Sequence, residues 1–154
     1  MVYLTLKYAH VVGAALLLGT GAGIAFFMLM AHRTGDAAHV ALTTGTVVVA
    51  DTVFTATAVI VQPVTGLLLA REAGYAFTET WIVASVSLYL VAGAAWLPVV
   101  AIQLRMRDLA RAAAASGAAL GEDYHRLFRR WLVLGFPGFG AVVAILWLMI
   151  AKPS

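Results

Sequence analysis

Four long apolar stretches, separated by short polar segments, dominate the chain. They run over residues 3–31, 43–70, 81–104 and 131–151. A helix needs about 20 apolar residues to cross the hydrocarbon core of a bilayer, and each stretch supplies that length. The pattern therefore predicts an all-α fold, an integral membrane four-helix bundle that forms a single transmembrane domain over residues 1–154.

Three of the apolar stretches contain a proline, at Pro63, Pro98 and Pro137. Proline removes a backbone donor, but it is tolerated in membrane helices because neighbouring groups satisfy the freed carbonyl. We therefore expect kinks rather than helix ends. Between the third and fourth spans we expect a helical loop over residues 105–130, in which RDLARAAAA predicts a helical extension that ends at Ser116-Gly117.

The basic residues are divided unequally between the two ends of the predicted bundle. The linkers after the first and third spans share one end, whereas the other end holds only Lys7, Arg71 and Lys152. The positive-inside rule puts the richer end in the cytoplasm and both termini outside, an N-out/C-out topology. Since the basic residues are nearly all Arg and Ala is abundant, we expect a bacterial cytoplasmic membrane. The arginines of the richer end are Arg33, Arg105, Arg107, Arg111, Arg126, Arg129 and Arg130.

Composition agrees with a membrane protein and removes several chemistries. Only 11% of residues are charged, whereas soluble domains have about 25%. The net charge of +3 lies beside the spans and does not indicate a nucleic-acid partner. Since the chain has no cysteine, disulfides, thiolate nucleophiles, iron–sulfur clusters and Cys-ligated zinc are excluded.

His10 is the leading candidate for chemistry because it lies within the first span. An ionisable side chain inside a membrane is costly and marks a functional site by default. Imidazole is also a common ligand of haem iron, zinc and copper. The alternative is a hydrogen bond to a neighbouring helix. His32, His39 and His125 fall on the cytoplasmic side, where we expect them to titrate in loops without ligating a metal.

Helix geometry places further groups near the depth of His10, in the predicted outer leaflet. Gln62 in the second span and Met149 in the fourth fall at this level, and Ser85 and Tyr89 bracket it in the third. Gln62 has an alternative role in repairing the kink at the following proline. Met149 has an alternative role in plain packing.

The residues around His10 on its own helix have two interpretations each. Lys7 lies one turn away on the same face, where it either snorkels to the headgroups or stands beside an anionic ligand group. Gly13 and Ala14 either leave room for a flat macrocycle or allow close packing of helices.

Asp51 is the second ionisable residue inside a span. It is predicted to lie about 10 Å from the cytoplasmic end of the second span. Candidate partners at that depth are Thr52, Thr55 and the indole of Trp96. The two interpretations are a structural hydrogen bond, which we favour, and a proton relay.

Three segments of the chain resemble a known family: LKYAHVVG, the Arg-rich segment before the last span, and the ending AKPS. They resemble the haem-binding HemJ-type protoporphyrinogen IX oxidases. These proteins have about four spans, a Lys-x-x-His in the first and a Pro-containing last span that ends in Lys-Pro. The matching positions are Lys7, His10, Pro137, Lys152 and Pro153. The whole chain is also similar to a family of predicted bacterial four-span membrane proteins of unknown function, in a wider group with copper resistance D-like proteins.

The chain departs from the oxidases at their charged positions. It has AGIAFFMLM where they carry an Arg, and WIVASVSLY where they carry a Lys. It has Leu134-Gly135-Phe136 before Pro137, where they carry an Asn-Glu pair. The resemblance therefore implies haem binding at His10 without protoporphyrinogen oxidase activity.

The leading hypothesis is a b-type haem protein with a redox or electron-transfer role. We expect a homodimer in membrane lipid that exchanges electrons with a donor or acceptor. The first alternative is a copper or small-solute transporter, although Cu(I) favours soft ligands and the methionines are scattered. The second alternative is a cofactor-free subunit of a membrane complex. The residues expected at the haem are His10 as the iron ligand, with Lys7, Gly13, Ala14, Gln62 and Met149.

Overall fold

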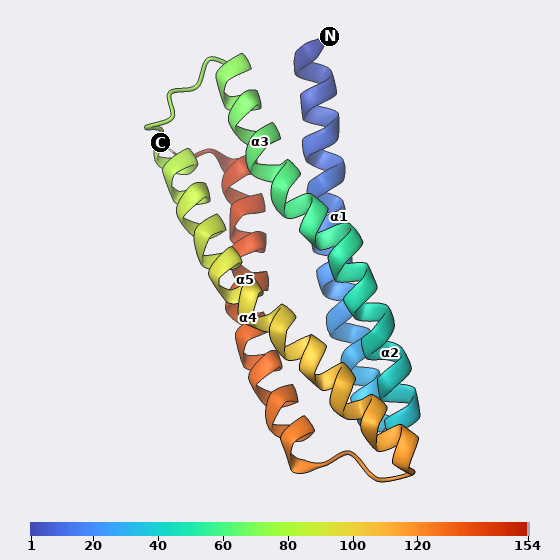
Figure 1. Ribbon diagram of the computed structural model, residues 1–154. Helices are drawn as coiled ribbons and strands as arrows, with labels where there is room; N and C mark the ends of the chain where they lie inside the picture. The colour runs from blue at the N-terminus through green and yellow to red at the C-terminus, as the bar shows by residue number, and fades with distance from the viewer. Residues whose placement is uncertain (154) are drawn as a thin grey trace.

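The computed structural model describes residues 1–153, which form four long helices side by side (Figure 1). Each helix is long and apolar enough to cross a membrane, so the predicted all-α bundle of four spans is confirmed. The second long helix consists of three segments, α2, η1 and α3. The elements are α1 (Val2–Thr34), α2 (Ala37–Ala50), η1 (Asp51–Thr55), α3 (Ala56–Glu72), α4 (Thr80–Ser116) and α5 (Glu122–Ala151).

Several helices extend beyond the predicted spans. The second begins at Ala37, because Asp36 caps it by accepting the Ala38 N–H at 3.0 Å. The fourth begins at Glu122, so the segment 105–130 is helical except for residues 117–121. Hydropathy marks only the part of a helix that meets hydrocarbon, and polar turns continue beyond it. The predicted end of α4 at Ser116 is confirmed, with the following glycine in the left-handed conformation (φ 68°).

The bundle has two distinct ends. Both chain termini and the linker 73–79 lie at one end, here called the terminal end (Figure 1). The linkers 35–36 and 117–121 lie at the other, which carries the seven arginines named above and is here called the basic end. α4 has 37 residues and is therefore about 55 Å long, well beyond the roughly 30 Å of a hydrocarbon core.

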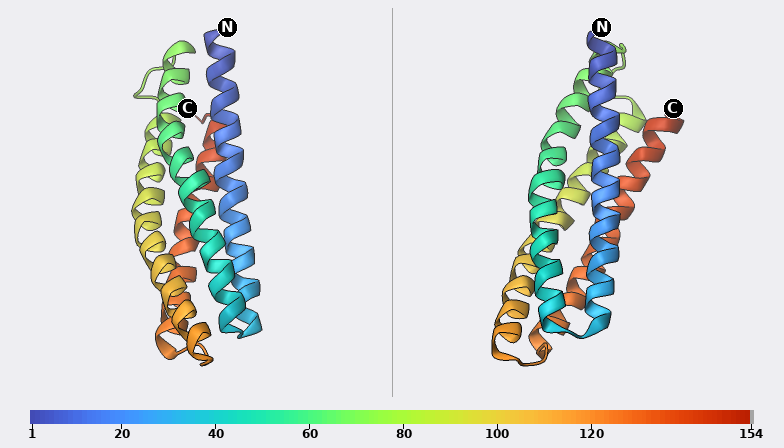
Figure 2. Two further views of the ribbon diagram at one scale, coloured as in Figure 1. Left: turned by 45° about the vertical axis from the view of Figure 1, so that its right-hand side comes forward. Right: turned by 90° about the vertical axis from the view of Figure 1, so that its right-hand side faces the viewer.

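The packed core lies toward the basic end. Its main cluster joins α1, α2, α4 and α5 and includes Met28, Val40, Met106 and Tyr124, each at most 1% exposed. At the terminal end the buried cluster is small and consists of Ala70, Trp81 and Ile82. α1 and α5 diverge toward that end (Figure 2). The terminal half of the bundle is therefore more open than the basic half.

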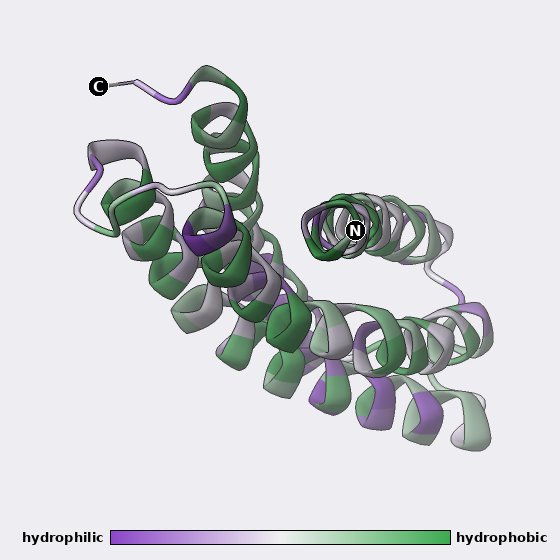
Figure 3. Ribbon diagram, turned by 90° about the horizontal axis from the view of Figure 1, so that it is seen from above, coloured by the Kyte–Doolittle hydropathy of each residue, from purple (hydrophilic) through white to green (hydrophobic). Residues whose placement is uncertain are grey.

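Large apolar side chains cover the outside of all four spans. Viewed from above, hydrophobic residues occupy all sides of the helices (Figure 3). Side chains such as Phe26, Ile60, Leu90 and Trp147 are more than half exposed. A helix that is hydrophobic all round requires either a protein core or lipid around it. Since these faces are not covered by protein within residues 1–153, the arrangement is that of a bundle surrounded by lipid.

The three prolines lie inside helices, so the prediction that they do not end the helices is confirmed. Pro63 cannot bond to the carbonyl of Val59 four residues earlier. The Tyr89 hydroxyl on α4 donates to that carbonyl instead. The carbonyl left free by Pro63 is thus bonded by Tyr89. The alternative role considered for Gln62, which was to satisfy the backbone at this proline, is wrong.

Candidate functional site

His10, a residue of α1, is held against α3 by side-chain and backbone contacts. Its Nδ1 lies 2.9 Å from the Thr65 hydroxyl oxygen. The Gln62 amide nitrogen donates to the His10 carbonyl oxygen at 2.9 Å. Gln62 and Thr65 are three residues apart on α3 and therefore share the face that meets α1. Both are less than 10% exposed, so this polar contact is internal to the helix pair.

We assign the tautomer of His10 from the Thr65 hydroxyl. With the hydroxyl proton directed at the Val61 carbonyl at 2.7 Å, the hydroxyl oxygen acts as an acceptor toward the imidazole. In this assignment Nδ1 carries the hydrogen and Nε2 carries the lone pair. Nε2 has no hydrogen-bond partner among residues 1–153 and is not among the buried polar atoms. The hydrogen bond to a neighbouring helix, which was the alternative role considered for His10, exists, and it leaves Nε2 without a partner among residues 1–153.

Two glycines let α1 and α3 approach. A Cβ added at Gly66 would lie 3.1 Å from Cε1 of His10, so the imidazole lies against bare backbone there. A Cβ added at Gly13 would overlap the amide nitrogen of Gln62. Gly13 is buried, and the space beside it holds the Gln62 side chain. Of the two interpretations of Gly13, close packing of helices is the one that the structure describes.

The other predicted site residues lie in separate places. Lys7 is exposed, with its ammonium 5.9 Å from the centre of the Tyr3 ring, and Ala14 is half-buried beside Gly13. Met149 packs against the terminal-end cluster of Ala70, Trp81 and Ile82. The predicted set therefore comes together only in part: His10, Gly13 and Gln62 form one contact, and Met149 belongs to another cluster.

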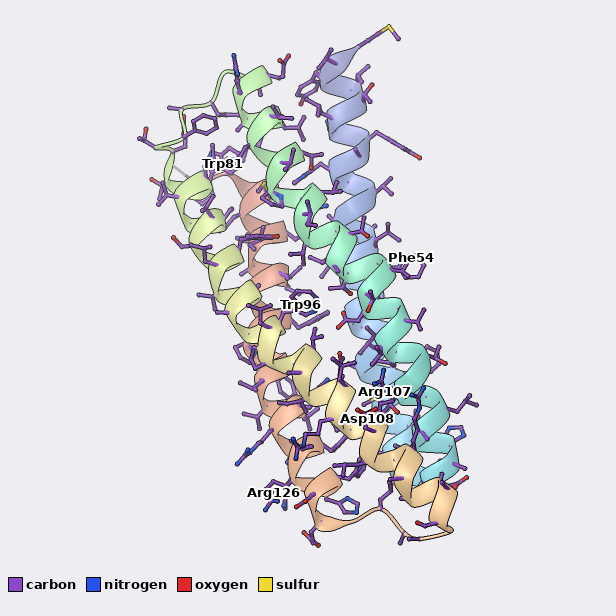
Figure 4. The ribbon with its side chains drawn as sticks, viewed as in Figure 1. Phe54, Trp81, Trp96, Arg107, Asp108 and Arg126 are labelled. Carbon is purple, nitrogen blue, oxygen red and sulfur yellow. The ribbon has the colours of Figure 1, made fainter. Side chains whose placement is uncertain are left out.

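A second polar site surrounds Asp51 in the middle of the bundle. The indole of Trp96, which Figure 4 labels on α4, donates to Oδ1 of Asp51 at 3.3 Å. With its amide oriented to satisfy its neighbours, Gln103 donates to Oδ2 at 3.0 Å and accepts from the Trp131 indole at 3.2 Å. Asp51 and Gln103 are 5% and 2% exposed. This network joins η1, α4 and α5, and the predicted Trp96 partner is confirmed.

Asp51 also begins a wide helical turn. Within η1 the Ala56 N–H bonds to the Asp51 carbonyl, five residues back instead of four. Thr52 donates to the Val48 carbonyl in the ordinary manner. Thr55 is buried, and its hydroxyl has no partner among residues 1–153. The expected contacts of Asp51 with Thr52 and Thr55 are therefore not made. Turns of this kind are frequent at functional sites.

The basic-end histidines lie on helices rather than in loops, which corrects the sequence prediction. His32 of α1 stacks on Phe128 of α5, with ring centres 3.6 Å apart and planes 5° apart. His125 meets the His32 ring edge-on at 5.5 Å. His39 is exposed on α2. No group of three possible metal ligands occurs within residues 1–153.

Burial changes the acidity of this aromatic cluster, which lies beyond the apolar stretches 3–31 and 131–151. It lowers the pKa of His32, and the nearby His125 lowers it further by charge repulsion. Burial also raises the pKa of Tyr124 to about 12. The uncharged forms of both side chains are therefore favoured at neutral pH.

Sequence reasoning missed Thr65, Gly66, Gln103 and Trp131. Thr65 had a usable signal, since it follows Gln62 at the i,i+3 spacing of one helix face. Gln103 also had one, because an amide in an apolar stretch needs a partner.

Four lipid-facing helices of membrane-spanning length define the class of this molecule, a multi-pass integral membrane protein. The chain belongs to the DUF2269 family of predicted integral membrane proteins, whose profile matches residues 4–153. The match includes both polar sites. No curated protein and no solved structure matches the chain.

Proposed function

We propose that this protein is a b-type haem protein in which Nε2 of His10 would bind the iron. The observation that carries the proposal is the hydrogen bond from Nδ1–H of His10 to Thr65. A metal-ligating histidine almost always donates its other ring N–H to a fixed acceptor. That bond sets the tautomer, orients the ring and increases the basicity of Nε2.

The surroundings of His10 suit a buried cofactor in two respects. The glycine at position 66 brings backbone rather than a side chain against the imidazole. Lys7, one turn toward the terminal end, supplies a cation for a propionate. Bound haem provides one-electron redox chemistry, which supports a role in electron transfer.

The proposal extends to location and assembly. The arginines of the basic end favour placing that end in the cytoplasm of a bacterium, with His10 in the outer half of the membrane. Exposed apolar faces on α1 and α5 are compatible with a homodimer, and electrons would pass to an external donor or acceptor.

Absorption spectra of the purified protein test the proposal. We expect a Soret band that sharpens and shifts on reduction and that is lost in His10→Ala. The exposed His39→Ala is the matched control and keeps the band. Thr65→Val, which removes the acceptor for Nδ1–H, weakens haem retention about 10- to 100-fold. Protein without a Soret band after expression with excess haem, or an unchanged band in His10→Ala, contradicts the proposal. Uptake of copper or a solute that depends on His10 without bound haem favours a transporter instead.

A further inference from the structure

Both groups that hydrogen-bond to the Asp51 carboxylate, the Trp96 indole and the Gln103 amide, are donors. The Trp96 indole has only a donor. The Gln103 amide oxygen is occupied by the Trp131 N–H, so the amide nitrogen must face Asp51. Each carboxylate oxygen of Asp51 accepts one bond, and neither bond requires a proton on Asp51.

As a carboxylate, Asp51 has no cationic partner among residues 1–153. Among residues 1–153, the ion pairs are Arg107–Asp108 and Arg126–Asp123, both near the basic end (Figure 4). Arg107 lies four residues beyond Gln103 on α4, but its guanidinium contacts Asp108 at 2.8 Å. Neutral donors do not cancel a buried charge, and an unpaired carboxylate inside a membrane is strongly disfavoured. The carboxylate therefore calls for a cation from outside the chain.

A pocket of about 200 Å³ lies beside the carboxylate. Trp96 and Gln103 line it together with aliphatic side chains, among them Val48 and Val100. Two further lining residues, Thr52 and Leu104, are exposed, so the pocket opens between η1 and α4 toward lipid. A ligand can thus reach Asp51 sideways from the membrane.

The lining chemistry distinguishes among cations. A hard metal ion requires about six oxygen ligands. The pocket offers one carboxylate and the Thr52 hydroxyl, whose proton is donated to Val48. An organic cation brings its own hydrocarbon surface to the aliphatic walls, and aromatic rings such as Trp96 attract cations. We propose that this pocket binds a small lipophilic ammonium ion, with its charge at the Asp51 carboxylate.

Binding of benzylammonium to the full-length protein in detergent tests the proposal, with benzyl alcohol as an uncharged probe of similar size. Labelling with 5-fluorotryptophan gives four ¹⁹F signals, one per tryptophan, and Trp96→Phe identifies that of Trp96. We expect benzylammonium to shift the Trp96 signal saturably and benzyl alcohol to bind at least tenfold more weakly.

Matched variants locate the charge. Asp51→Asn keeps the shape of the side chain and is expected to weaken benzylammonium binding at least tenfold. Asp36→Asn, in the linker between α1 and α2, is expected to leave it unchanged. Val100 lines the pocket, so the larger side chain in Val100→Phe reduces the space for a ligand while Asp51 is kept. This variant is expected to abolish binding even if Asp51→Asn does not fold.

Several results would overturn the inference. One is equal affinity for the charged and uncharged probes. Another is undiminished binding in Val100→Phe. A third combines two results: benzylammonium does not bind, and the infrared spectrum shows a C=O band of a protonated carboxyl that disappears in Asp51→Asn. In that case a proton alone neutralises the site.

Discussion

Replacing Gly13 by alanine tests the contact that holds His10 in place. The new Cβ would overlap the Gln62 amide nitrogen, so the amide must move away. That movement breaks the 2.9 Å bond from Gln62 to the His10 carbonyl. Gln62 is only 9% exposed, so its amide finds no easy substitute. We therefore expect Gly13→Ala to lower the free energy of unfolding.

The magnitude follows from one cost and one gain. The atom that must move is the end of the flexible Gln62 side chain, so the steric cost is small. Leaving a buried hydrogen-bonding group without its partner costs about 1–3 kcal/mol. Alanine gains about 0.5–1 kcal/mol over glycine inside a helix. Gly19 on the same helix has open space around its position, so Gly19→Ala shows the gain alone. The two variants should therefore differ by about 1–3 kcal/mol.

Unfolding by sodium dodecyl sulfate in mixed micelles, followed by circular dichroism, measures this difference. The double variant Gly13→Ala/Gln62→Ala adds a second test, because removing the amide relieves the overlap. The two substitutions should then be non-additive by at least about 1 kcal/mol. If Gly13→Ala is as stable as Gly19→Ala, or additive with Gln62→Ala, the α1–α3 contact described here is wrong.

Two further predictions concern the basic end. Burial lowers the pKa of His32 in the folded state, so below the unfolded value of about 6.5 the unfolded chain binds the proton more readily. Thermal stability should therefore fall as the pH is lowered from 7.5 to 5.5, and this slope should flatten in His32→Gln but not in the control His39→Gln. An unchanged slope in His32→Gln would refute the assignment. Met106 is 0% exposed in the main cluster, so Met106→Ala should lower the free energy of unfolding by about 2–5 kcal/mol in the sodium dodecyl sulfate assay. Val133 faces lipid, so Val133→Ala should change it by less than about 0.5 kcal/mol. Similar losses in both variants would contradict the placement of the core.

The four spans were predictable because the bilayer imposes them. Hydrocarbon excludes unpaired backbone groups, so an apolar stretch of this length must be helical. The end of α4 was predictable for a different reason, since Gly117 adopts a left-handed conformation that glycine alone tolerates well. The first residues of α2 and α5 lie outside the apolar stretches and were not predictable from hydropathy. Capping by Asp36 determines the start of α2, and acidic residues in the first turn favour the start of α5.

The error in helix ends concealed the partner of Asp51. With α2 starting at Ala37, Asp51 lies 51 − 37 = 14 residues in from the basic end. With α4 ending at Ser116, Gln103 lies 116 − 103 = 13 residues in. At about 1.5 Å per residue the two side chains share a depth of about 20 Å. The predicted third span ended at residue 104, which placed Gln103 at a membrane surface instead of beside Asp51.

The rotation of the second long helix was also hidden from the sequence. Asp51 and Gln62 are eleven residues apart, which is about three turns plus 20° in a regular α-helix, so both would occupy one face. The wide turn η1 takes up about one extra residue, or roughly 100° of rotation. Asp51 consequently faces Trp96 and Gln103 on α4, whereas Gln62 faces His10 on α1. One helix thereby serves two polar sites on different neighbours, and a regular helix would bring Asp51 to the same side as His10.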